Sequence, residues 1–192
     1  VLDRTMPDGH DVDFVKADLA AFIPRDEKLH RPHAVIHLAG VNIFGRLTPD
    51  HKEAIYTSRV LGTKHLVEWM KEAEYQPQVF AAASAVGYYG DAGDGILDEA
   101  APQGTSFLAK VVRDWEHEIV QAKFYGIRTV AFRQGHVFGV GGFLGALLPL
   151  YKKGLGGPIG TGEQWLPWIH IHDLVQLYSE AIENQSVQGI YN

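Results

Sequence analysis

The sequence predicts an α/β fold in which a doubly wound parallel β-sheet is covered by helices on both faces. Short, nearly continuous apolar runs recur along the 192-residue chain, and segments with helical periodicity separate them. Apolar runs that do not alternate with polar residues are typical of parallel strands buried on both faces. A succession of strand, helix and strand places the strands in one sheet through right-handed crossovers.

Three apolar runs are the expected central strands, and they cover residues 34–39, 79–84 and 129–133. Weaker patterns predict another strand over residues 14–19 and parts of strands at residues 1–2 and 190–191. Helical spacing fills the intervals. Thr48 followed by Pro49 is a strong start signal, because threonine caps a helix and proline suits its first position. We expect this helix to extend to about residue 74 and further helices over residues 106–124, 144–151 and 173–182.

The composition excludes several functional classes. The formal net charge of −6 disfavours nucleic acid or an anionic membrane as the main partner, because both favour a basic face. The chain has no cysteine, which excludes disulfides and thiolate metal sites. No apolar run approaches the roughly 18–20 residues of a membrane helix. We therefore expect a cytoplasmic protein that acts on a small molecule. Its oligomeric state is left open, with a homodimer as one option.

The expected domain organisation has three parts. Residues 1–138 form the main α/β core. Residues 139–168 are rich in glycine and are expected to make an excursion toward a small substrate lobe. Residues 169–192 return to the core with a helix and the start of a strand.

Four sequence blocks in this order resemble one family. They are residues 35–40 (VIHLAG), 58–63 (SRVLGT), 83–90 (ASAVGYYG) and 160–174 (GTGEQWLPWIHIHDL). Together they resemble the NAD-dependent epimerase/dehydratase superfamily of extended short-chain dehydrogenases/reductases. More narrowly, they are similar to its atypical branch of epimerase family proteins, also described as SulA-type nucleoside-sugar epimerases.

The resemblance implies a Rossmann-like fold that is truncated at both ends. Members open with a strand and a Gly-x-x-Gly-x-x-Gly loop that seats a pyrophosphate on a helix N-terminus. They end in a C-terminal substrate domain. No strand with such a loop opens this chain, so we expect both parts to be missing and the functional expectations to concern the parent protein.

The resemblance also implies a nicotinamide dinucleotide as cofactor. The residues expected to contact it are Leu38, Ala39, Gly40, Ser58, Lys110, Arg133, Gly135, His136 and Val137, with Asp18 on the adenine side. Gly62 follows Ser58 by one helical turn, and close packing would explain it as well as ligand approach. Arg4 resembles an arginine that takes a 2′-phosphate, which favours NADP(H) over NAD(H). The neighbouring Asp3 is instead the residue type that binds the ribose hydroxyls of NAD.

The usual catalytic pair of the family is incomplete. Members carry Tyr-x-x-x-Lys on the helix after the serine of the third block, and the lysine ammonium lowers the pKa of the tyrosine. Here Ser84 and Lys110 are present, but Ser106 stands where the tyrosine is expected. Serine is a weaker acid with a shorter side chain. Tyr88 or Tyr89 is therefore the candidate source of a phenol, with simple packing as the alternative role.

Three histidines allow other interpretations. His136 is either an acid or base at the nicotinamide end or a structural residue. His170 and His172 would share a face if they lay on one strand. No third ligand follows them at a usual metal spacing, so we expect no metal site. Asp173 is expected to cap the helix that follows.

The sequence thus predicts an NAD(P)-dependent oxidoreductase or epimerase of unknown substrate, with a nucleotide sugar suggested only by the family name. The alternative is a catalytically inactive NADP(H)-binding sensor or scaffold, which the missing tyrosine favours. A methyltransferase of similar fold is a weaker third option, and the block at residues 160–174 together with Lys110 disfavours it.

Overall fold

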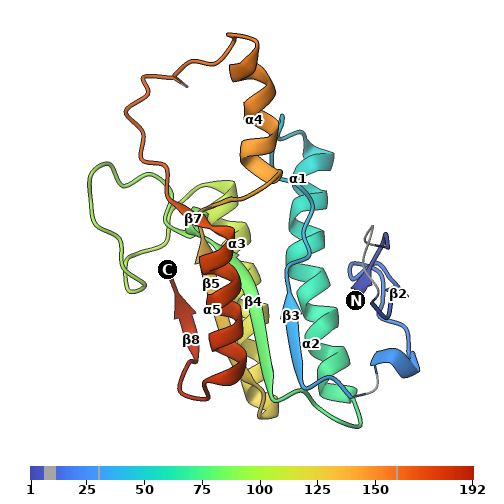
Figure 1. The fold of residues 1–192 in the computed structure, drawn as a ribbon. Coiled ribbons are helices and arrows are strands. Elements are labelled where there is room, and N and C mark those ends of the chain that lie inside the picture. The colour runs from blue at the N-terminus through green and yellow to red at the C-terminus, as the bar shows by residue number, and fades with distance from the viewer. Residues whose placement is uncertain (7–11, 30, 159) are drawn as a thin grey trace.

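The structure is a computed structural model that describes residues 1–6, 12–29, 31–158 and 160–192. Its centre is a four-stranded sheet in the order β3-β4-β5-β8 (Figure 1). The strands are β3 (Ala34–His37), β4 (Val79–Ala85), β5 (Arg128–Gln134) and β8 (Gly189–Tyr191). All neighbours in this sheet run parallel, which confirms the predicted fold class.

Helices cover both faces of the sheet. On one face α1 (Pro49–Tyr56), the π-helical segment η2 (Thr57–Leu61) and α2 (Gly62–Glu72) follow one another without a break, and α3 (Phe107–Gln121) lies beside them. On the other face lies α5 (Ile171–Glu183) (Figure 1). The predicted start signal is confirmed, because Thr48 Oγ1 accepts a hydrogen bond from the His51 amide at 3.3 Å.

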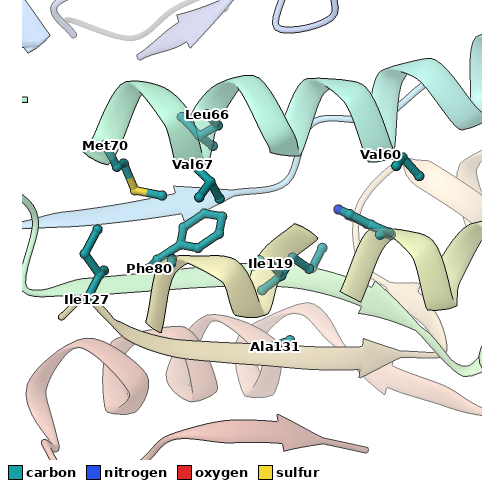
Figure 2. Close-up of a cluster of buried hydrophobic side chains, with 12 residues drawn as sticks. Val60, Leu66, Val67, Met70, Phe80, Ile119, Ile127 and Ala131 are labelled. Carbon is teal, nitrogen blue, oxygen red and sulfur yellow. The ribbon is translucent and has the colours of Figure 1, made fainter. Parts of the chain in front are cut away.

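The central strand β4 explains why its sequence shows no alternation of apolar and polar residues. Successive side chains of a strand point to opposite faces. Phe80 joins the cluster with α2 and α3, whereas Val79 joins the cluster with α5. Figure 2 shows Phe80 pointing toward Val67 of α2, with Ile119 of α3 nearby. Phe80 is fully buried, and such a side chain stabilises the fold by about 1.5–3 kcal/mol.

Shorter elements frame the sheet. The strands β1 (Leu2–Asp3) and β2 (Val15–Lys16) form a separate parallel pair, so the strand predicted over residues 14–19 is shorter than expected. The 3-10 turn η1 (Glu27–Leu29) follows β2, and η3 (Val86–Tyr88) follows β4. The 3-10 turn η4 (Ala122–Tyr125) extends α3 and ends at Gly126, whose φ of 81° is left-handed.

The glycine-rich excursion is bracketed by a second parallel pair, β6 (His136–Phe138) and β7 (Trp168–His170). Between them lies α4 (Gly142–Lys152), which projects beyond the edge at which the strands of the central sheet end (Figure 1). Within the described ranges, no helix combines the length and apolarity needed to cross a lipid bilayer.

One expectation for the returning segment, the cap of its helix, is wrong. The residue that caps α5 is His170, whose Nδ1 accepts a hydrogen bond from the His172 amide at 3.3 Å, and Asp173 lies in the first turn of the helix. A carboxylate there still interacts favourably with the helix dipole. His170 and His172 do not share a strand, because the helix begins at Ile171, and their ring centroids lie 5.1 Å apart.

Candidate functional site

The candidate site lies at the edge of the sheet where the parallel strands end. In open α/β sheets ligands bind at this carboxyl edge, because the loops there diverge and leave room for them. The loops after β3, β4 and β5 all start here, and the N-terminal turns of α1 and α3 point back to it (Figure 1). The sequence-predicted site residues are found mainly in these segments.

The loop after β3 is held by two consecutive residues of the π-helical segment. Ser58 Oγ accepts a hydrogen bond from the Val41 amide at 3.1 Å, and Arg59 Nη1 donates to the Val41 carbonyl oxygen at 2.8 Å. Ser58 Oγ also donates to the Ile55 carbonyl at 3.1 Å. Both backbone groups of Val41 are therefore satisfied by side chains. Single π-helical turns inside α-helices frequently mark functional sites.

Arg59 also explains the glycine that ends the first block. A Cβ built on Gly40 would lie 2.9 Å from Arg59 Cζ, so the guanidinium occupies the space beside the backbone. Ahead of this point Leu38 is 62% exposed at the sheet edge. The burial of the guanidinium lowers the pKa of Arg59. Gly62, by contrast, is explained by packing, because a Cβ there would contact Leu19 Cβ at 3.3 Å.

A buried histidine lies beneath this loop. His37 Nε2 is 2.9 Å from Thr63 Oγ1, and the histidine side chain is 2% exposed. Burial lowers the pKa of His37 to about 4, and the nearby charge of Arg59 contributes to the same shift. His37 is therefore neutral at physiological pH and acts as a packed, hydrogen-bonded core residue.

Ser84 belongs to a buried ionic network. Its hydroxyl donates to Glu116 Oε1 on α3 at 2.5 Å. Arg133 at the end of β5 donates to both oxygens of the same carboxylate, each at 2.8 Å. The side chains of Glu116 and Arg133 are 6% and 4% exposed. The Ser84 hydroxyl thus connects β4 to α3, Arg133 connects β5 to the same carboxylate, and the Arg133 side chain points into the protein.

The tyrosine pair extends this network. Arg133 Nη1 donates to the Tyr89 hydroxyl at 2.7 Å, and that hydroxyl donates to Asn192 Oδ1 at 2.6 Å. Arg133 Cζ also lies 3.6 Å from the centroid of the Tyr88 ring. Tyr89 is therefore an internal side chain. Tyr88 is half-buried, and its hydroxyl makes no hydrogen bond to any residue that the structure describes.

The structure explains why serine stands at position 106. Ser106 is the N-cap of α3, and its Oγ accepts a hydrogen bond from the Ala109 amide at 3.1 Å. Position 106 thus precedes the helix instead of lying within it, and serine is among the best capping residues. Lys110 lies one turn further on, is exposed, and lines a shallow hollow with Lys52 and Tyr56 of α1.

The segment after β5 is shaped by a close crossing of the chain. A Cβ on Gly135 would lie 2.5 Å from the Pro167 carbonyl oxygen, so only glycine fits there. The His136 amide donates to the same carbonyl at 2.9 Å, and its ring lies 4.5 Å from the Phe143 ring between centroids. Val137 packs against the cluster around α5.

The residues predicted for the adenine side lie apart from this edge network, in the N-terminal segment. Arg4 is exposed and follows β1, and its amide donates to Asp3 Oδ1 at 2.5 Å. Asp18 Oδ1 accepts a hydrogen bond from the Ala20 amide at 3.0 Å. The segment docks on α2 through the Leu19 carbonyl, which lies 2.8 Å from His65 Nδ1.

Sequence reasoning missed Arg59, Glu116 and Asn192. Glu116 had a visible signal, because it lies on the apolar face of α3 between Trp115 and Ile119. A carboxylate on such a face needs a buried cationic partner. Arg59 belongs to the family block at residues 58–63, but no recognisable sequence pattern predicts the π-helical turn that directs its side chain toward Gly40.

A parallel sheet with helices on both faces defines this protein as an α/β protein of the Rossmann-like class. The chain belongs to the NAD dependent epimerase/dehydratase family, whose model matches residues 2–192. The family predicted from the four sequence blocks is therefore confirmed.

Curated relatives agree with this assignment. The chain is 41% identical over 162 residues to an epimerase family protein, the chloroplastic SDR39U1 homolog of Arabidopsis thaliana. The matched region covers 83% of this chain and 46% of that protein. It is 38% identical over 158 residues to the epimerase family protein YfhF of Bacillus subtilis, with 82% and 52% covered. The chain thus spans about half the length of the curated relatives it matches.

Solved structures show the same fold. The human epimerase family protein SDR39U1 (isoform 2), solved with NADPH, is 30% identical with a TM-score of 0.79, and 98% of this chain and 63% of that chain are covered. A nucleoside-diphosphate sugar epimerase from Corynebacterium glutamicum is 41% identical with a TM-score of 0.71, and 83% and 34% are covered.

Proposed function

We propose that the protein containing this chain is an NAD(P)-dependent oxidoreductase or epimerase that prefers NADP(H). The observation that carries the proposal is that side chains hold the loop after β3 in place at the carboxyl edge of the central sheet. Its backbone at Val41 is clamped by Ser58 and Arg59, and Leu38 is exposed beside it. The human relative solved with NADPH favours a phosphorylated dinucleotide, and so does the exposed Arg4.

The residues at this edge fit a dinucleotide. Residues 38–40 would lie along it, Lys110 would reach its ribose, and Arg4 would donate hydrogen bonds to the 2′-phosphate. Asp18 remains the candidate on the adenine side, and His136 the candidate near the nicotinamide. A bound nicotinamide supplies hydride transfer, while the protein orients the reacting groups and excludes water. The Corynebacterium relative favours a nucleotide sugar as substrate.

At the reacting end we assign proton transfer to Tyr88 and electrostatic assistance to Lys110. Of the two tyrosines, Tyr88 is the one whose hydroxyl makes no hydrogen bond within the described residues, and Arg133 stacks on its ring. Ser84 and Tyr89 act as positioning residues in this proposal, because their hydroxyls bind Glu116 and Asn192.

A second candidate function is a dinucleotide-binding sensor without turnover. It is favoured by the use of the Ser84, Tyr89 and Ser106 hydroxyls in internal hydrogen bonds or helix capping. The two candidates differ in hydride exchange, since a sensor binds NADPH but does not transfer its hydride to any substrate.

Calorimetric titration of the full-length protein with NADPH, and separately with NADH, tests the proposal. The enzyme and the sensor both require saturable binding that is tighter for NADPH. Tighter binding of NADH would still support a dinucleotide site, but it would indicate that Asp3, and not Arg4, determines the cofactor specificity. Absence of binding by either at millimolar concentration would refute the proposed function. Oxidation of NADPH by a panel of keto-sugar nucleotides then separates enzyme from sensor.

A further inference from the structure

The clearest imbalance of charge and hydrogen bonding at the carboxyl edge surrounds Arg59. A guanidinium has five N–H donors, and the structure gives that of Arg59 one acceptor, the Val41 carbonyl. No carboxylate among the described residues forms an ion pair with it. Half-buried charges normally have an oppositely charged or polar partner, because desolvation is costly.

Among the described residues, the aromatic neighbour of Arg59 supplies a π face and a further unsatisfied donor. Its Cζ lies 5.4 Å from the centroid of the Trp115 ring. The indole Nε1 of Trp115 is buried and has no hydrogen-bond partner in the described part of the chain. His37, which interacts electrostatically with Arg59, is neutral at physiological pH. Within the described ranges the guanidinium thus has a carbonyl and a π face as partners but no carboxylate, and an unsatisfied N–H donor lies on the same aromatic side chain, which leaves room for an anionic acceptor.

The position of Arg59 identifies the kind of acceptor. The guanidinium lies against Gly40, in the loop that follows β3 three residues after the strand ends at His37. Ser58 and Arg59 fix the next residue, so the guanidinium is held in place before any ligand arrives. The planar fork of arginine matches the oxygens of a phosphate group.

We propose that Arg59 is an oxyanion-binding residue whose guanidinium takes a phosphate oxygen of a diphosphate lying across the sheet edge beside Gly40. The inference rests on the proposed function for the identity of the diphosphate, which belongs either to the dinucleotide or to a nucleotide-sugar substrate. Besides its expected contact with the dinucleotide, Gly40 then has a second role, because the absence of a Cβ leaves space for the guanidinium beside the loop.

Affinity measurements with matched variants of the full-length protein test this inference. The probes are inorganic pyrophosphate, NADPH and UDP-glucose, titrated into wild type, Arg59→Gln and Arg59→Lys. The control is Arg113→Gln, which removes the same charge from an exposed arginine that pairs with Asp114 at 2.6 Å. Loss of one charge-assisted hydrogen bond corresponds to roughly tenfold or more in affinity.

We expect Arg59→Gln to bind pyrophosphate at least about tenfold more weakly, Arg59→Lys to be intermediate, and the control to stay within about twofold of wild type. An accompanying loss for NADPH assigns the diphosphate to the cofactor, and a loss for UDP-glucose alone assigns it to the substrate. If Arg59→Gln binds all three probes as tightly as the control, the inference is overturned and the proposed function stands. If pyrophosphate binding depends on Arg59 but wild type binds neither NADPH nor NADH, the proposed function fails and the anion site remains.

A measurement on the unsubstituted protein covers the case in which the variants do not fold. Phenylglyoxal modifies accessible arginines, and peptide mass spectrometry reads the extent at Arg59 and at Arg113. Pyrophosphate is expected to slow modification of Arg59 severalfold and to leave Arg113 unaffected. Equal rates at Arg59 with and without pyrophosphate would overturn the inference.

Discussion

Replacement of Glu116 by alanine is expected to be among the most destabilising single changes in this chain. The carboxylate accepts two hydrogen bonds from Arg133 and one from Ser84, and the side chains of the ion pair are almost inaccessible to solvent. Removing it leaves the Arg133 guanidinium buried without its partner. Loss of one member of a buried ion pair typically costs about 3–5 kcal/mol.

Urea denaturation of the full-length protein, followed by circular dichroism, measures this cost as the change in unfolding free energy. The matched control is Arg113→Ala, which breaks the exposed pair with Asp114 and should cost no more than about 1 kcal/mol. The double variant Glu116→Leu with Arg133→Met removes both buried charges, so it should lose less than the sum of the two single changes. A cost below about 1 kcal/mol for Glu116→Ala would refute the reasoning that the ion pair holds α3 to the sheet.

Three further predictions concern the site and its support. Tyr88→Phe should lower the turnover of the full-length enzyme by about 10²–10⁴-fold and leave NADPH affinity unchanged; unchanged turnover would remove Tyr88 from the reaction. His37 has a pKa of about 4, below the unfolded value of 6.5, so its neutral form stabilises the fold above pH 6.5. That contribution, up to about 3 kcal/mol, should be lost as the pH falls from 6.5 to 4, and His37→Gln should abolish the difference. Gly135→Ala should cost about 1–3 kcal/mol because its Cβ would meet the Pro167 carbonyl, whereas Gly87→Ala has free space and should be nearly neutral in thermal denaturation.

The sheet and its covering helices were predictable because their signals are local and strong. Apolar runs identified the buried strands, and Thr48 with Pro49 marked the start of α1. The π-helical turn at Thr57–Leu61 was not predictable, since its residues continue the helical pattern without interruption. The cap of α5 was misassigned because aspartate is the commoner capping residue, and a histidine that caps through its ring has no sequence signature.

The candidate site was predicted in position but not in its internal contacts. The residues after β3, β4 and β5 meet at one edge because parallel strands end together. Whether a hydroxyl forms hydrogen bonds inside the protein depends on the direction of its side chain, and the sequence around Ser84 and Tyr89 does not show this direction. Their partners, Glu116 and Asn192, lie 32 and 103 positions further along the chain. Pairings over such separations are set by packing and leave no local pattern.

The central claim is that a nicotinamide dinucleotide binds along the carboxyl edge of this sheet. Hydrogen–deuterium exchange of the full-length protein, measured by mass spectrometry with and without NADPH, tests the claim most directly. We predict slower exchange in peptides that cover residues 38–42, 84–90 and 133–137, and no change in peptides from the opposite edge, such as residues 74–78. Slower exchange confined to segments away from the carboxyl edge, or no change at saturating NADPH, would contradict the account.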